Sequence, residues 1–153
     1  MSRQWVLQMG EGYYGRHGTL GIATPQANVT AETEFRALLP RGVACATVRM
    51  ASNSPDPEDR LRAYFTDIGQ TLDRFDTLAM GAVGLACTGS SYLLGHESVE
   101  ATLAALSTRR QQPVISAAAA IERALNHIGA RSIALICPYP EWLLAAAERH
   151  WQG

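Results

Sequence analysis

The stretch that decides the fold is TLAMGAVGLAC, residues 77–87, which is followed at once by the small, mostly polar residues TGSS, residues 88–91. From Leu78 onward it is almost entirely apolar and includes no charged residue. An apolar run bounded by turn residues predicts a strand that is buried on both faces. Strands of this kind occur in parallel sheets, so we expect further strands and covering helices on either side of it.

Strands and helices are expected to alternate along the chain from about residue 18. The other candidate strands are TLGIAT, VACATVRM, PVIS and SIALIC, at residues 19–24, 43–50, 113–116 and 132–137. Helical patterns occupy residues 30–39, 61–75, 98–110, 117–129 and 140–153. This order predicts an α/β fold, with a parallel sheet flanked by helices in a flavodoxin-like, three-layer α/β/α arrangement.

The length of 153 residues predicts one domain. We expect an irregular, aromatic and glycine-rich N-terminal lead-in at residues 1–17 and a single α/β domain at residues 18–153. The lead-in lacks the apolar segment of a signal peptide, and no apolar run is long enough to span a bilayer. The three cysteines are odd in number and show no zinc-like spacing, which argues against a disulfide framework and a metal site. A reducing, cytoplasmic location is therefore expected.

Charge excludes several classes of function. The net charge of −1 gives no electrostatic case for binding nucleic acid or an anionic membrane. All 13 basic residues are arginines, which excludes a Schiff-base lysine and the lysine of a phosphate-binding P-loop. No G-x-G-x-x-G fingerprint follows the first expected strand.

Ligands of open parallel sheets bind beyond the carboxyl ends of the strands, and three loops there carry suggestive residues. The first contains Asn28 and, at the start of the next helix, Thr30 as the expected N-cap. The second is CTGSS, where Cys87 precedes a helix whose N-terminus favours anions and the thiolate form. The third is CPYPE, where two prolines flank Tyr139. Each loop is also explained by ordinary capping and core packing, and the local sequence leaves both interpretations open.

Together these loops resemble the aspartate/glutamate racemase superfamily, in particular the branch of maleate cis–trans isomerases and arylmalonate decarboxylases. The resemblance runs from about Gly18 to the end of the chain. It rests on P-x-x-N-x-T after the first strand, ACTGSS after the third, and ISAAAAIERALNHIGARSIALICPYPE, residues 115–141, which leads to the Pro-Tyr turn.

The resemblance implies a chemistry that uses no cofactor and no metal. Cys87 corresponds to the family's first catalytic cysteine, a nucleophile or acid/base that acts on a small dicarboxylate or amino-acid substrate. The residues expected to hold the substrate carboxylate are Asn28, Thr88, Gly89, Ser90 and Tyr139. Preorganised donors of this kind stabilise the enediolate-like charge that develops next to a carboxylate.

Family members have two similar domains that face each other, each with one catalytic cysteine, and this sequence resembles the first half only. We therefore expect one half of a two-domain racemase fold, and a homodimer that covers the apolar face left open. Cys137 does not match the position of the second cysteine. Three alternatives to an isomerase or racemase are a decarboxylase of a malonate-type substrate, a module that binds small carboxylates without turnover, and a flavodoxin-like scaffold with an unrelated ligand.

Overall fold

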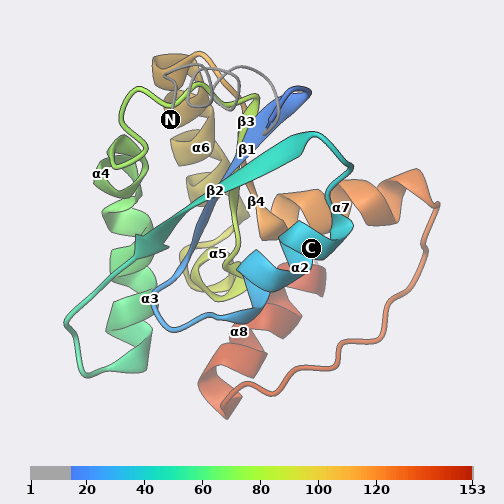
Figure 1. The fold of residues 1–153 in the computed structure, drawn as a ribbon. Coiled ribbons are helices and arrows are strands. Elements are labelled where there is room, and N and C mark those ends of the chain that lie inside the picture. The colour runs from blue at the N-terminus through green and yellow to red at the C-terminus, as the bar shows by residue number, and fades with distance from the viewer. Residues whose placement is uncertain (1–14, 153) are drawn as a thin grey trace, which may run out of the picture.

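A computed structural model of the chain describes residues 15–152 (Figure 1). Its four strands are all parallel, and their order across the sheet is β2-β1-β3-β4. Their bounds are β1 (Gly18–Pro25), β2 (Val43–Met50), β3 (Ala82–Leu85) and β4 (Val114–Ser116). The expected α/β fold with a parallel sheet flanked by helices is confirmed, and all four carboxyl ends lie at one edge of the sheet.

Helices cover both faces of this sheet. One face carries α3 (Pro57–Thr66), α4 (Ile68–Asp73) and α6 (His96–Arg110), and the other carries α2 (Thr30–Leu38) and α7 (Ala117–His127) (Figure 1). Two more helices, α5 (Thr88–Leu94) and α8 (Glu141–Gln152), pack on each other beyond the carboxyl edge of the strands. Residues at the strand ends therefore lie next to the packed pair α5 and α8.

The main core lies between the sheet and the first of these faces. Its members are apolar side chains with less than a tenth of their surface exposed, among them Val48, Met50, Phe65, Ile68, Leu72, Phe75, Val83, Leu85, Val99 and Leu103. Helix residues at spacings of three and four supply one wall, and alternate strand residues supply the other. Burial of this set holds β3, and the loop that follows it, in a fixed position.

The turn-rich segment before α3 starts that helix as its sequence indicates. Asp56 is the N-cap and accepts a hydrogen bond from the backbone N–H of Asp59 at 2.9 Å, and Pro57 occupies the first turn. The single helix expected at residues 61–75 is interrupted, because Asp67 leaves helical geometry with φ −94° and ψ 11°. Two shorter helices, α3 and α4, result.

The prediction of a strand at residues 132–137 is wrong. Residues 130–140 form an extended connection without regular secondary structure, and most of them are exposed (Figure 1). The side chain of Ile136 is 94% exposed. A strand needs a neighbour for its backbone N–H and C=O groups, and within residues 15–152 no strand lies alongside this segment to pair with it. Hydrophobic periodicity in the sequence does not show whether a segment has a neighbouring strand.

The expected lead-in at residues 1–17 lies mostly outside the described residues, and β1 begins at Gly18, where the domain was expected to begin. The division into lead-in and domain stays a prediction. Between residues 15 and 152 no helix combines the length and apolar character needed to cross a membrane.

Candidate active site

Cys87 lies where β3 gives way to α5, at the carboxyl edge of the sheet. The backbone N–H of Ala86 still donates to the carbonyl of Ala23 in β1 at 2.8 Å, so the strand pairing persists to the residue before the cysteine. Cys87 itself is extended, with φ −149° and ψ 101°, and occupies the N-cap position of α5. The half-buried thiol thus stands next to the unsatisfied N–H groups of the first helical turn.

Ser90 contacts this thiol from one turn further along α5. Its Oγ lies 3.4 Å from the Cys87 sulfur and donates to the backbone carbonyl of Leu61 in α3 at 2.7 Å. Because a hydroxyl has one hydrogen, Ser90 accepts from the thiol while it donates to Leu61. Ser90 is buried and ties α5 to α3, so its hydroxyl orients the cysteine and its hydrogen is already used within the protein.

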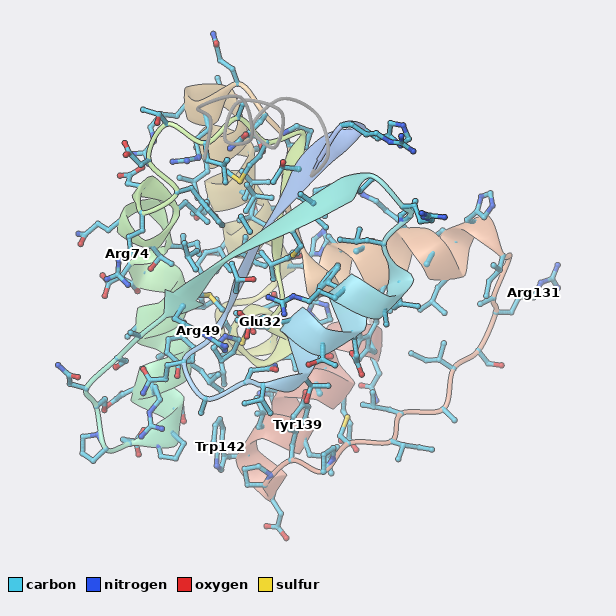
Figure 2. All side chains as sticks on the ribbon, viewed as in Figure 1. Glu32, Arg49, Arg74, Arg131, Tyr139 and Trp142 are labelled. Atoms are coloured by element: carbon cyan, nitrogen blue, oxygen red, sulfur yellow. The ribbon has the colours of Figure 1, made fainter. Side chains whose placement is uncertain are left out.

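Thr88 and Tyr139 are brought together although they lie 51 residues apart. The Thr88 Oγ1 is 3.1 Å from the Tyr139 hydroxyl. Tyr139 lies immediately before α8 (Figure 2), and its ring meets Tyr92 of α5 edge-on at a centroid distance of 6.4 Å. The Trp151 Nε1 of α8 also donates to the Tyr92 hydroxyl, at 3.2 Å. Aromatic packing between α5 and α8 therefore places the phenol beside Thr88.

Asn28 lies in the loop after β1, the strand that pairs with β3. Its Oδ1 accepts from the backbone N–H groups of Thr30 and Ala31, at 2.9 and 3.0 Å. The expectation that Thr30 caps α2 is wrong, because Asn28 provides that cap from outside the helix. Within residues 15–152 the Asn28 Nδ2 donates to no other group, so the amide keeps both of its donors for a ligand.

Gly89 is buried in α5 for reasons of packing. A Cβ at this position would lie 3.2 Å from one Leu61 methyl group and 3.6 Å from a Leu143 methyl group of α8. The missing side chain thus lets α3 and α8 approach α5 closely. The backbone N–H of Gly89, in the first turn of the helix, remains the part of this residue that suits an anion.

Tyr64 of α3 lies within the helical pattern of residues 61–75 and belongs to the main core. The side chain is 4% exposed. Burial raises the pKa of its phenol, Arg60 counters this, and the nearby Cys87 raises it further. A neutral phenol therefore stays near the cysteine at neutral pH. A tyrosine among leucines and phenylalanines at helical spacing is the one signal that could have marked it.

The Cys45 thiol lies apart from this group, whereas the His150 ring lies 5.0 Å from the ring of Tyr92, measured between centroids. Cys45 is on the α2 side of β2, and burial raises its pKa. Among the described residues no cluster of three or more His, Cys, Asp or Glu side chains could hold a metal ion. A cavity of about 1040 Å³ lies between residues 92–96, α7, residues 130–133 and α8, and Cys87 does not line it.

The structure thus places the Cys87 thiol next to the Thr88, Ser90 and Tyr139 hydroxyls and the first N–H groups of α5, while Asn28 lies on the loop after the neighbouring strand β1. A thiol can add to an activated carbon or move a proton, and donors fixed around the adjacent carboxylate stabilise the charge that either reaction develops. The fold and site define an α/β protein with a cysteine at the end of its third strand, as in the aspartate/glutamate racemase-like proteins.

Comparisons with known proteins agree with this class. No protein-family model matches the chain. It is similar to a maleate isomerase of Geobacillus stearothermophilus, with 31% identity in a 144-residue alignment that covers 81% of this chain and 54% of that protein. This homologue confirms the resemblance to the maleate isomerase branch.

Solved structures show the same fold. A maleate isomerase of Pseudomonas putida S16 has a TM-score of 0.77 at 19% identity, over 88% of this chain and 59% of that one. Arylmalonate decarboxylase has a TM-score of 0.60 at 19% identity, over 86% and 58%. The chain therefore spans little more than half the length of the relatives it matches.

Proposed function

We propose that the chain carries the cysteine half of a cofactor-independent cis–trans isomerase for a small unsaturated dicarboxylate such as maleate. The observation that carries the proposal is Cys87 at the carboxyl end of β3, beside the pair formed by Thr88 and Tyr139. A maleate cis–trans isomerase from Nocardia farcinica, 23% identical with a TM-score of 0.77, has been solved with a covalently bound succinylcysteine intermediate. That adduct supports a nucleophilic role for Cys87.

The reaction begins when the Cys87 thiolate adds to one carbon of the double bond and a carbon–sulfur bond forms. The π electron pair moves to the neighbouring carbon and into its carboxylate. The carbon–carbon bond is then single and rotates, and the returning pair expels the thiolate and restores the double bond in the other geometry. In the resting state the thiol donates a hydrogen bond to Ser90, and its proton passes to solvent before the attack.

The carboxylate donors are Asn28 Nδ2, the Thr88–Tyr139 pair and the first N–H groups of α5, including those of Gly89 and Ser90. In the Thr88–Tyr139 pair one hydroxyl donates to the other, so one hydroxyl hydrogen is left for the substrate. These groups are fixed before the substrate arrives, which is the condition under which they lower the barrier most.

Replacement of Cys87 tests the proposal directly. C87A and C87S are expected to abolish conversion of maleate to fumarate, followed by the loss of the maleate signal and gain of the fumarate signal in proton NMR. C45A and C137A serve as matched controls and should retain turnover. Far-ultraviolet circular dichroism and thermal unfolding should show intact folding in all four variants. Equal rates in wild type and C87A would refute the role of Cys87.

The alternative of a non-catalytic carboxylate-binding module makes a different prediction for the thiols. In an enzyme, iodoacetamide should alkylate Cys87 ahead of Cys45, whose pKa is raised by burial, and maleate should protect Cys87. Peptide mass spectrometry measures both. A Cys87 as inert as Cys45, in a protein that still binds maleate, would favour the binding module.

A decarboxylase is the second candidate, because arylmalonate decarboxylase shares the fold. Release of carbon dioxide from phenylmalonate without isomerisation of maleate would favour it. The proposal also includes assembly as a homodimer and a cytoplasmic location. It is supported by exposed apolar side chains and by three unpaired cysteines.

A further inference from the structure

Arg49, at the carboxyl end of β2, binds the loop that carries Asn28. It lies opposite Thr24 in the strand register. Its Nη1 donates to the backbone carbonyl of Asn28 and, at 3.3 Å, to that of Pro25. Its Nη2 forms an ion pair with the Glu32 carboxylate in the first turn of α2, and Figure 2 shows the two side chains next to each other.

These contacts fix the Asn28 amide from the backbone side. The carbonyl of Asn28 is held by Arg49, and its Oδ1 is held by the N–H groups of Thr30 and Ala31. The N–H of Asn28 also closes a turn to the Pro25 carbonyl, at 3.0 Å. With both oxygens and the backbone N–H bonded, the two Nδ2 hydrogens point in a direction set by the loop itself.

We infer that Arg49 is the positioning residue that holds Asn28 in the geometry in which its amide donates to a substrate carboxylate. The inference deepens the proposed function and rests on it. Arg49 does not bind the substrate carboxylate itself, because Glu32 compensates its charge and both Nη1 hydrogens are directed at the loop carbonyls.

The geometry of the contact suits arginine and not lysine. Two carbonyls and one carboxylate are reached from two nitrogens of one rigid plane, whereas a lysine offers a single nitrogen on a flexible stem. Loss of this fork leaves the loop free to shift, and a displacement of about 1 Å at a positioned group can lower a rate by about 10²-fold. Loss of the Arg49 side chain should therefore weaken ligand binding only through the contact that Asn28 makes.

The test uses R49M, R49K, N28A, the double variant R49M/N28A and the control R74M. Arg74 also donates to a backbone carbonyl at the end of β2, that of Arg49 at 3.3 Å, and its removal takes nothing from the loop. If R49M fails to fold, R49K, which keeps the charge and the aliphatic stem, carries the test. The probes are maleate and the saturated dicarboxylate succinate, which binds without turnover.

Two measurements decide the question. Nitrogen-15 relaxation of the Asn28 side-chain amide should report a rigid group in wild type and R74M, with an order parameter near about 0.85, and a mobile group below about 0.6 in R49M. The Kd for succinate should rise about tenfold in R49M, less in R49K, and not at all in R74M. In the N28A background R49M should add nothing to Kd.

The outcomes separate this inference from the proposed function. A rigid Asn28 amide in both R49M and R49K, or effects of R49M and N28A on Kd that simply multiply, would overturn the positioning role. If the wild-type chain binds neither succinate nor maleate and turns over no maleate, the proposed function fails. The relaxation of the Asn28 amide then still decides whether Arg49 holds it.

Discussion

The hydroxyl groups next to the Cys87 sulfur keep their own hydrogens. Ser90 accepts a hydrogen bond from the thiol and donates its own hydrogen to the Leu61 carbonyl, and Tyr64 stays neutral because burial raises its pKa. Such surroundings orient a thiol without a strongly basic partner. Activation of Cys87 is therefore expected to depend on the first N–H groups of α5 and on the substrate, and less on a paired imidazole.

Substitutions of Gly89 test whether this residue serves packing or ligand approach. Alanine improves helix propensity by about 1 kcal/mol, but its Cβ presses on Leu61 at 3.2 Å, so G89A should change stability by less than about 1 kcal/mol. Valine adds two methyl groups between α5, α3 and α8, and G89V should destabilise by about 1–3 kcal/mol. Urea unfolding followed by circular dichroism measures both.

Binding of succinate supplies the control for Gly89. G89A keeps the backbone N–H, so its Kd should stay near that of wild type. A large loss of affinity in a stably folded G89A would mean that a ligand approaches the α-carbon itself.

At the residue scale the sequence predicts which side chains belong to the site better than it predicts their hydrogen-bond partners. The position of Cys87 at a strand end, at the same edge of the sheet as the loop of Asn28, follows from alternating strands and helices. The contact of Thr88 with Tyr139 came only from a resemblance, since 51 residues separate them. The hydrogen bond from Ser90 to the Leu61 carbonyl and the capping of α2 by Asn28 could not be predicted. Each depends on the position of a loop in three dimensions.

At the scale of elements, apolar periodicity predicted four strands and the covering helices. It did not predict the interruption of the helix at Asp67. It also missed α5, a short helix that carries no apolar stripe of its own. It also predicted a strand at residues 132–137, because SIALIC has the composition of one. Composition reports what a segment could bury, whereas a strand also requires a neighbour.

His150 of α8 should make the docking of this helix sensitive to pH. Burial lowers its pKa below the usual 6.5, His96 of α6 lowers it further, and Glu122 of α7 counters them. The unfolded chain then binds the proton more readily than the folded one. The stability that neutral His150 provides is present above about pH 6.5 and is lost as pH falls through the lower folded pKa.

Thermal unfolding between pH 8 and pH 5 measures this linkage. The Tm of wild type should decline more steeply below about pH 6.5 than that of H150Q, which takes up no proton there. H127Q removes an exposed histidine of α7 and should follow wild type. Parallel curves for wild type and H150Q would show that His150 is not linked to folding. The slopes are compared, since H150Q also loses the ring contact with Tyr92.

On the scale of the whole molecule, apolar side chains remain outside the core on the side of α2, α7 and the segment 130–140. Val29, Leu38 and Ile128 are each more than 70% exposed, and Ile136 is 94% exposed. Exposed apolar surface of this extent marks an interface more often than a free surface. In the proposed homodimer a second copy of the chain covers it.

The double variant I128S/I136S tests that assembly without disturbing the monomer. Both side chains are largely exposed, so the substitutions should alter the stability of the monomer by no more than about 0.5 kcal/mol. Sedimentation velocity should show a dimer for wild type, and a shift toward monomer for the variant at the same concentration. Leu78, 44% exposed in the turn before β3, provides the control L78S, which should sediment as wild type does. A wild type that stays monomeric, or a variant as dimeric as wild type, would mean that this apolar side does not join two copies.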